Sequence, residues 1–179
     1  LGWEIYTPTE YGLTLWDELR KKSQEFNMIC SGAGAFESLR LEKGYRSLGS
    51  DIHTNSNPYE AGLGFTVKLK KEMDFIGKQA LLKLKETSLN KKLCCMILDD
   101  NDGMALGKEP IYDDAGKPVG YVTSANYGYF VEKHILYGYL PTTHANEGTK
   151  LEIDYFGKRY PVVVTKEPLL DPENKRLKS

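Results

Sequence analysis

From Leu93 to Thr165 the sequence consists of short apolar segments separated by turn signals, and this pattern most restricts how the chain can fold. Leu93 to Leu98 is a continuous apolar run, which is typical of a buried strand. Glu109 to Tyr112 and Pro118 to Thr123 flank Ala115-Gly116, and this arrangement predicts a hairpin. Strand segments that recur about every 8–12 residues indicate a small antiparallel barrel or sandwich.

The later strands follow the same pattern. His134 to Leu140 alternates so that Ile135, Tyr137 and Tyr139 share one face. Leu151 to Tyr155 and Tyr160 to Thr165 are separated by Phe156-Gly157, which predicts another hairpin. We therefore assign residues 89–170 to a β-barrel domain and residues 171–179 to a polar, mobile tail.

Residues 1–88 have a different pattern, which mixes helices and short strands. Thr7 to Glu10 matches a capping box and opens a helix to about Phe26, and Ala35 to Lys43 predicts a second helix stopped by Gly44. Asp74 is the expected N-cap of a third helix. Alternation predicts strands at Gly2–Tyr6 and Leu63–Leu69, with a short one at Met28–Cys30. The predicted fold class is α+β: a partial α/β domain followed by a small antiparallel barrel or sandwich.

Composition excludes several classes of function. The formal net charge of -1 leaves no basic surface for nucleic acid, and no apolar run is long enough for a membrane span. The three cysteines and three histidines lack metal-ligand spacing, and neighbouring Cys94 and Cys95 are expected on opposite sides of a strand as buried, inert thiols. No catalytic triad or phosphate loop can be assembled, so we assign no catalytic residue and no metal site.

Two charged residues remain as candidates for binding. Arg40 lies off the apolar line of the second helix, which would present its guanidinium as a rigid bidentate donor. Glu4 and Tyr6 share one face of the first predicted strand. A simpler interpretation stays open for both charges: Glu4 in water on an edge strand, and Arg40 paired with Glu37 or another nearby acid.

Three segments carry a family resemblance: Leu39-Arg-Leu-Glu-Lys-Gly44, Glu60-Ala-Gly-Leu63 and Asp74-Phe-Ile-Gly-Lys78. In their order and spacing they resemble the C-terminal half of the glycine-cleavage T-protein (aminomethyltransferase) family. Lys43-Gly-Tyr45 and Glu167-Pro-Leu169 add similarity to the tetrahydrofolate domain of dimethylglycine and sarcosine dehydrogenases. The resemblance implies that residues 1–88 are the C-terminal part of the folate-binding domain.

The same resemblance implies a ligand for the candidate pair. In T-protein relatives, the Glu of a Gly-Tyr-Glu segment and the Arg of a Leu-Arg-Leu-Glu segment contact tetrahydrofolate, and they correspond to Glu4 and Arg40. Trp3 stands where Tyr is commoner, and Tyr6 is a third candidate. A carboxylate suits the parallel N–H donors of a pterin, and an arginine suits a carbonyl oxygen or a glutamate tail.

The parent enzyme, by resemblance, would oxidise an N-methyl amine such as dimethylglycine or sarcosine at FAD and pass the one-carbon unit to tetrahydrofolate. Leu1 does not look like a natural start, so we expect a piece of a longer protein whose N-terminal portion holds the FAD module and the proton-transfer carboxylate. The chain alone would then be inactive. Its expected partners are folate, the amine-derived one-carbon unit and that N-terminal portion, in bacterial cytoplasm or the mitochondrial matrix.

Two other functions stay open. The regulatory subunit of pyruvate dehydrogenase phosphatase resembles the same branch, so the chain could serve a non-catalytic regulatory or adaptor protein. A stand-alone glycine-cleavage T-protein that acts with a lipoyl carrier is the third possibility.

Overall fold

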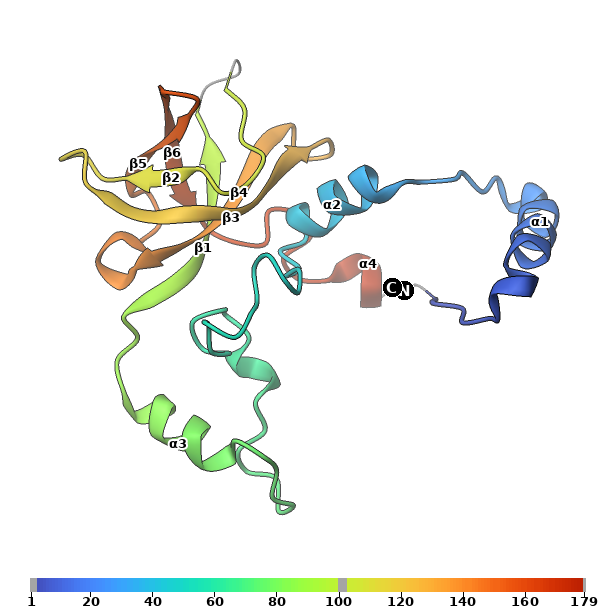
Figure 1. Cartoon of the computed structure of the whole chain (residues 1–179), viewed down its shortest axis with the longest axis horizontal. Coiled ribbons are helices and arrows are strands. Elements are labelled where there is room, and N and C mark those ends of the chain that lie inside the picture. Colours follow the sequence, from blue (N-terminus) through green and yellow to red (C-terminus); the bar gives the residue numbers. More distant parts are fainter. Residues whose placement is uncertain (1–2, 100–102, 179) are drawn as a thin grey trace.

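The computed structural model describes residues 3–99 and 103–178, and it consists of helical and turn segments followed by a closed β-barrel (Figure 1). The strands are β1 Lys91–Leu98, β2 Pro110–Tyr112, β3 Pro118–Gly128, β4 Lys133–Pro141, β5 Lys150–Tyr155 and β6 Lys158–Thr165. Neighbouring strands are antiparallel, in the order β1-β4-β3-β2-β5-β6 around the barrel. The α+β class with a small antiparallel barrel is confirmed.

Turn chemistry explains the two hairpins. Between β2 and β3, the Asp113 side chain accepts a hydrogen bond from the Lys117 amide at 2.8 Å, and Gly116 has φ 74°. Between β5 and β6, Phe156 and Gly157 both have positive φ, 50° and 82°. Two-residue turns of that kind match the right-handed twist of the strands they join. Both predicted hairpins are therefore present, at the expected turns.

The strands separate two apolar cores. Successive side chains of a strand point to opposite faces, so Cys94 belongs to the cluster inside the barrel and Cys95 to a cluster outside it. The outer cluster comprises Leu41, Leu93, Cys95, Ile135, Tyr137 and Tyr139. The predicted placement of the two cysteines is confirmed, as is the shared face of the three β4 residues. Burial raises the pKa of Cys94 to about 11 and that of Cys95 to about 12.

The helices differ in how they relate to the barrel. They are α1 Gly12–Lys22, α2 Ala33–Glu42, α3 Lys78–Glu86 and α4 Lys175–Lys178, with 3-10 turns η1 Thr9–Tyr11, η2 Ser23–Phe26, η3 Gly64–Thr66 and η4 Thr142–His144. Figure 1 shows α2 against the barrel, whereas α1 and α3 stand away from it. Among the described helices, none combines the length and apolar character needed to cross a membrane.

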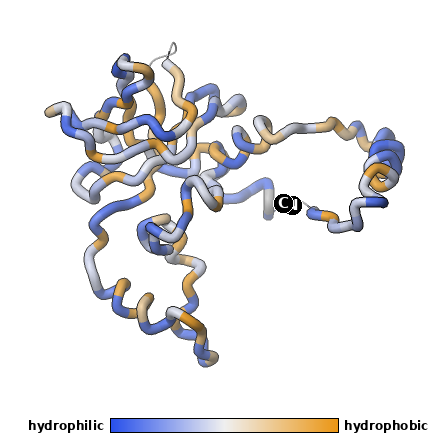
Figure 2. The backbone as a smooth tube through the Cα atoms, in the orientation of Figure 1, coloured by the Kyte–Doolittle hydropathy of each residue, from blue (hydrophilic) through white to orange (hydrophobic). Residues whose placement is uncertain are grey.

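The apolar residues of α1 face solvent. No residue of Gly12–Lys22 is buried, and Trp16 and Leu19 are exposed. Figure 2 shows further apolar positions along α1 and the chain that leads to α2. The predicted helix up to Phe26 is present as η1, α1 and η2. The predicted capping box is wrong, because Pro8 occupies the N-cap position of η1 and no side chain makes a capping hydrogen bond there.

Three predicted strands are wrong. Residues 3–6, 28–30 and 63–69 form no strand in the structure, and the last contains the 3-10 turn η3; Gly2 lies outside the described residues. Alternation predicts a strand only where a partner strand is available, and none within residues 3–99 and 103–178 pairs with these segments. The third helix begins after Gly77, which has φ 91°, so the predicted Asp74 N-cap is also wrong.

Candidate functional site

Helix α2 buries three polar residues together with Leu41, whereas two of its large apolar residues face solvent. Its buried residues are Ser38, Arg40, Leu41 and Glu42. Phe36 is 68% exposed and Leu39 is 58% exposed, although they form the apolar line seen in the sequence. A buried polar face is tolerated only when its groups have hydrogen-bond partners, so the partners on the barrel explain this orientation.

Arg40 lies at the centre of this face, and acceptors surround its whole guanidinium. Nη1 donates to Asp51 Oδ2 at 2.5 Å and to the Tyr45 carbonyl at 3.2 Å. Nη2 donates to Ser124 Oγ at 2.7 Å. Glu37 Oε2 accepts from Nε at 2.8 Å and lies 2.7 Å from Nη2. Arg40 thus donates four hydrogen bonds, and the ion pair with Glu37 adds a close contact at Nη2.

Asp51 is the carboxylate on which the buried contacts converge. Its Oδ2 accepts from Arg40 and, at 2.9 Å, from the Ser47 amide. Its Oδ1 accepts from Thr123 Oγ1 at 2.5 Å and from Ser124 Oγ at 2.7 Å. The residue is fully buried, and a carboxylate offers about four acceptor positions. Asp51 is therefore saturated, which is the condition under which a buried charge pair is tolerated.

A β-bulge makes this convergence possible. Thr123 and Ser124 are consecutive in β3, and side chains of consecutive residues in a regular strand point to opposite faces. The pairing of β3 with β4 shifts between Val122, opposite Gly138, and Ser124, opposite Tyr137. Such a shift places an extra residue in one strand and redirects its side chain. As a result both hydroxyl groups reach the same oxygen of Asp51.

Two further residues of α2, Ser38 and Glu42, bind the end of β3 and its connection to β4. Ser38 Oγ donates to the Tyr127 carbonyl at 2.7 Å. The buried Glu42 carboxylate accepts from the Phe130 amide at 2.7 Å and from the Val131 amide at 3.0 Å. These bonds satisfy backbone groups that a tight connection leaves without strand partners.

The segment after β6 holds the end of α2 from the other side. Arg46 pairs with both oxygens of Glu167, at 2.5 and 2.7 Å. Burial opposes the charged form of Arg46, but the bond and the charge of Glu167 outweigh it, so the pKa of Arg46 is raised. Lys43 donates to the Asp171 carbonyl at 2.6 Å. The pKa of Asp171 is lowered because amide hydrogen bonds and Lys43 outweigh its desolvation.

The structure does not bring the three predicted folate-binding residues together. Glu4 and Tyr6 are exposed, and the Tyr6 hydroxyl donates to Glu4 Oε2 at 2.8 Å. Within residues 3–99 and 103–178, no hydrogen bond or ion pair joins either of them to Arg40. Arg40 instead pairs with Glu37 and Asp51, as the simpler interpretation of the sequence expected for Glu37 or a nearby acid.

The sequence contains little that identifies Asp51, Thr123 and Ser124 as part of the site around Arg40. Asp51 lies in a polar loop where an acid is expected in water, and the two hydroxyl residues lie in a strand pattern. Asp51 follows the Arg40 helix closely in sequence, which is the one signal that could have indicated the pair. The bulge has no signal, because it depends on pairing with β4.

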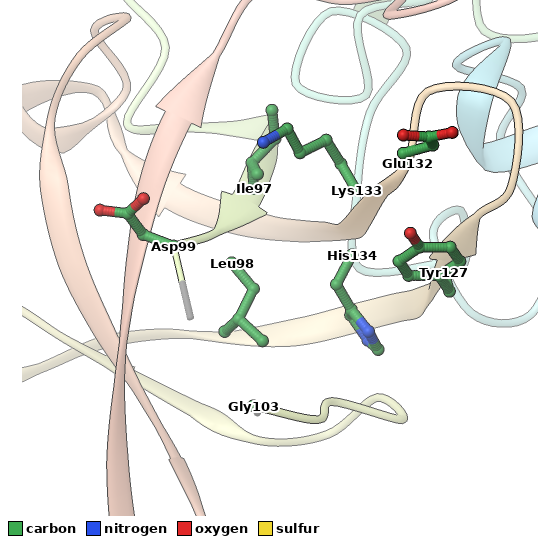
Figure 3. A pocket seen from close by; sticks show the side chains of 8 residues that line it. All are labelled: Ile97, Leu98, Asp99, Gly103, Tyr127, Glu132, Lys133 and His134. Atoms are coloured by element: carbon green, nitrogen blue, oxygen red, sulfur yellow. The ribbon is translucent and has the colours of Figure 1, made fainter. Parts of the chain in front are cut away.

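Figure 3 shows a separate pocket of about 270 Å³ at one end of the barrel. It is lined by Ile97, Leu98, Asp99, Gly103, Tyr127, Glu132, Lys133 and His134. The charged side chains do not converge on one point in Figure 3, and His134 Nε2 is 2.9 Å from the Ala105 carbonyl. In the part of the chain that the structure describes, no cluster of three or more His, Cys, Asp or Glu is placed to hold a metal ion.

Family models match most of the chain. Residues 1–71 match the GCVT N-terminal domain, and residues 91–171 match the glycine cleavage T-protein C-terminal barrel domain. The crystal structure of the glycine cleavage system aminomethyltransferase T from Bartonella henselae has the same fold, with a TM-score of 0.81 at 24% identity; 92% of this chain and 45% of that chain are covered. The two matched models are the two domains of a T-protein-type chain. This chain belongs to the glycine-cleavage T-protein family.

Curated relatives include larger proteins. Human mitochondrial dimethylglycine dehydrogenase is 39% identical over 179 residues, which are 99% of this chain and 21% of that protein. The mitochondrial pyruvate dehydrogenase phosphatase regulatory subunit of Mus musculus is 35% identical over 175 residues, which cover 89% of this chain and 20% of that protein. This chain thus spans about a fifth of the length of these relatives.

Proposed function

We propose that this chain forms part of a tetrahydrofolate-dependent aminomethyltransferase-type enzyme, in the branch of the dimethylglycine and sarcosine dehydrogenases. The observation that carries the proposal is the end-to-end match: a dimethylglycine dehydrogenase aligns with 99% of the chain. In the proposed reaction the oxidised N-methyl group of an amine is passed to tetrahydrofolate as a one-carbon unit. This chain contributes folate binding and scaffold rather than the catalytic acid.

The chemistry of the donor set fits tetrahydrofolate. Glu4 is exposed, and among the described residues its one hydrogen bond comes from Tyr6, so its carboxylate can accept from the parallel N–H groups of a pterin. Arg40 is held rigidly by Asp51 and Ser124, and its remaining edge faces Glu37, whose side chain is 42% exposed. An arginine edge suits a carbonyl or carboxylate oxygen of the ligand.

Tetrahydrofolate would supply the nucleophilic nitrogen that accepts the one-carbon unit. The chain's own residues would orient the pterin and keep water from the reactive carbon. Holding the two reacting groups in the right geometry lowers the activation barrier of the transfer. FAD would be bound by a part of the parent protein outside this chain. We infer that the all-β barrel braces the helix that carries Arg40, because Asp51 links that helix to β3.

The test is calorimetric titration of tetrahydrofolate into the whole natural polypeptide that carries this sequence. Glu4→Ala and Arg40→Lys should each weaken binding by about 1–3 kcal/mol, the cost of a charge-assisted hydrogen bond. Glu10→Ala changes another exposed carboxylate of the same segment and should leave binding unchanged. Absence of binding in the unaltered protein would contradict the proposal.

A non-catalytic regulatory or adaptor role is the second candidate. It is favoured by the 35% identity to the pyruvate dehydrogenase phosphatase regulatory subunit. That role predicts a folded protein that shows neither tetrahydrofolate binding nor transfer of a one-carbon unit. Measuring the melting temperature with and without tetrahydrofolate separates the two candidates, because a ligand stabilises only a protein that binds it.

A further inference from the structure

The partners of Arg40 fall into two groups with different exposure. Asp51 and Ser124, on the inner side, are 0% and 6% exposed. Glu37, on the outer side, has a side chain that is 42% exposed, and it occupies the edge formed by Nε and Nη2. The Tyr45 carbonyl, which accepts from Nη1, covers the remaining donor of that nitrogen with a backbone group. On the Nε–Nη2 edge the half-exposed partner is the Glu37 side chain.

The ion pair of Arg40 with Glu37 is also expected to stabilise the chain less than its ion pair with Asp51. Glu37 meets both nitrogen atoms with a single oxygen, Oε2, at 2.8 and 2.7 Å. A planar guanidinium edge is matched best by two oxygen atoms that accept two parallel hydrogen bonds. A half-exposed pair separated by three residues on one helix contributes little, whereas breaking the buried pair with Asp51 would leave an uncompensated charge.

We propose that Glu37 is a displaceable internal partner of Arg40: a carbonyl or carboxylate oxygen of the ligand takes the Nε–Nη2 edge by exchange with Glu37, while Asp51 and Ser124 stay in place. The inference rests on the proposed function and adds to it a competitor built into the same helix. Asp51 is then a positioning residue, because it fixes the direction of the guanidinium without touching the ligand. Glu37, freed from Arg40, returns to solvent.

Exchange has a measurable signature, because every ligand must first compete with Glu37. Removing the competitor should therefore tighten binding, which is the opposite of what loss of a merely structural contact would do. For a half-exposed ion pair the expected gain in affinity is about two- to fivefold. The same substitution should leave binding through Glu4 intact, since no contact joins Glu37 to Glu4 in the described chain.

The experiment measures the Kd of tetrahydrofolate for the whole natural polypeptide and for its Glu37→Gln and Glu37→Ala variants. Glu18→Gln is the matched control, because it removes one exposed helical carboxylate of α1 that is not bonded to Arg40. Arg40→Lys is measured in parallel. We expect tighter binding for both Glu37 variants, an unchanged Kd for Glu18→Gln and weaker binding for Arg40→Lys.

The outcomes separate this inference from the proposed function. If the unaltered protein does not bind tetrahydrofolate, the proposed function fails. If it binds and Arg40→Lys weakens it, but the Glu37 variants bind equally or less tightly, only the exchange fails. Where a Glu37 variant lowers the melting temperature, NMR of the Arg40 Nε–H group in the unaltered protein decides. Exchange requires that resonance to move when tetrahydrofolate is added, and an unmoved resonance overturns the inference.

Discussion

Arg40 Nη1 lies 2.5 Å from Asp51 Oδ2, and this buried ion pair joins a helix to a barrel strand through the hydroxyl groups of Thr123 and Ser124. The pair spans eleven residues of sequence, but the hydroxyl partners come from a strand more than seventy residues away. Its consequences can be tested one group at a time.

Asp51→Asn should destabilise the chain by about 3–5 kcal/mol, because it leaves Arg40 charged and buried without its buried anion, and the half-exposed Glu37 compensates only weakly. The free energy of unfolding from urea titration measures this loss. Asp114→Asn, on an exposed turn, provides the matched control and should change stability by less than about 0.5 kcal/mol. Similar effects of the two substitutions would contradict a buried, saturated Asp51.

Thr123→Val keeps the shape of the side chain and removes the hydroxyl donor to Asp51. We expect a loss of about 1–2 kcal/mol in the free energy of unfolding. Combined with Asp51→Asn in a double-mutant cycle, the two losses should not add, because both act on one hydrogen-bonded network. Strict additivity would show that the bulge places Thr123 near Asp51 without energetic coupling.

Gly120→Ala tests the close approach of β3 and β4. A Cβ at Gly120 would lie well within the van der Waals contact distance of the Tyr139 carbonyl oxygen, which is a backbone atom of the paired strand. The strands would have to separate, at a cost of at least about 2 kcal/mol measured by thermal or urea unfolding. Gly12→Ala, at which no atom lies within 4 Å of the new Cβ, should be neutral or slightly stabilising.

Thiol reactivity should distinguish Cys30 from the other two cysteines. Cys30 is exposed, whereas Cys94 and Cys95 are buried. Titration with a chromogenic disulfide under native conditions should label Cys30 rapidly, and the remaining two only after unfolding, because reaction requires an accessible thiolate. Rapid labelling of three thiols in the native chain would rule out the barrel cores described above.

Stability should fall at alkaline pH. Burial raises the thiol pKa of Cys94 to about 11 and that of Cys95 to about 12 in the folded chain, from an ordinary value of 9.0. Between pH 9 and these values the unfolded state binds fewer protons, so the free energy of unfolding decreases as pH rises, and below pH 9 the contribution is fully present. The double variant Cys94→Ala/Cys95→Ala should reduce the fall in the free energy of unfolding between pH 9 and 12. An equally steep fall in this variant would show that the two thiols do not cause it.

The barrel could be predicted from sequence because its signals are local. The continuous apolar run of β1, the alternation in β4 and the turn at Phe156-Gly157 can each be read from a few neighbouring residues, although β1 pairs with the remote strands β4 and β6. The same alternation fails at residues 3–6, where no partner strand is present among the described residues. An alternating sequence pattern corresponds to a strand only where the fold provides a neighbouring strand for it to pair with.

The candidate site was less predictable, because its partners are remote. Arg40 was identified as a helix-borne guanidinium, but the apolar line of Phe36 and Leu39 suggested the opposite buried face. The orientation of α2 is decided by hydrogen-bond partners on β3 and its following loop, and their positions depend on barrel closure. Helical periodicity carries no information about such partners.

The ties of α2 also imply an order of folding. Its partners come from β3, at Ser124, and from the segment after β6, at Leu170, whose amide donates to the Glu42 carbonyl. These partners reach their final positions only when the barrel has closed, which requires β1 to pair with both β4 and β6. Because these pairings join residues that are far apart in sequence, we expect barrel closure to be slow. We therefore expect the barrel to form first and the arginine helix to dock last, so that the candidate binding residue is the final part of this chain to become ordered.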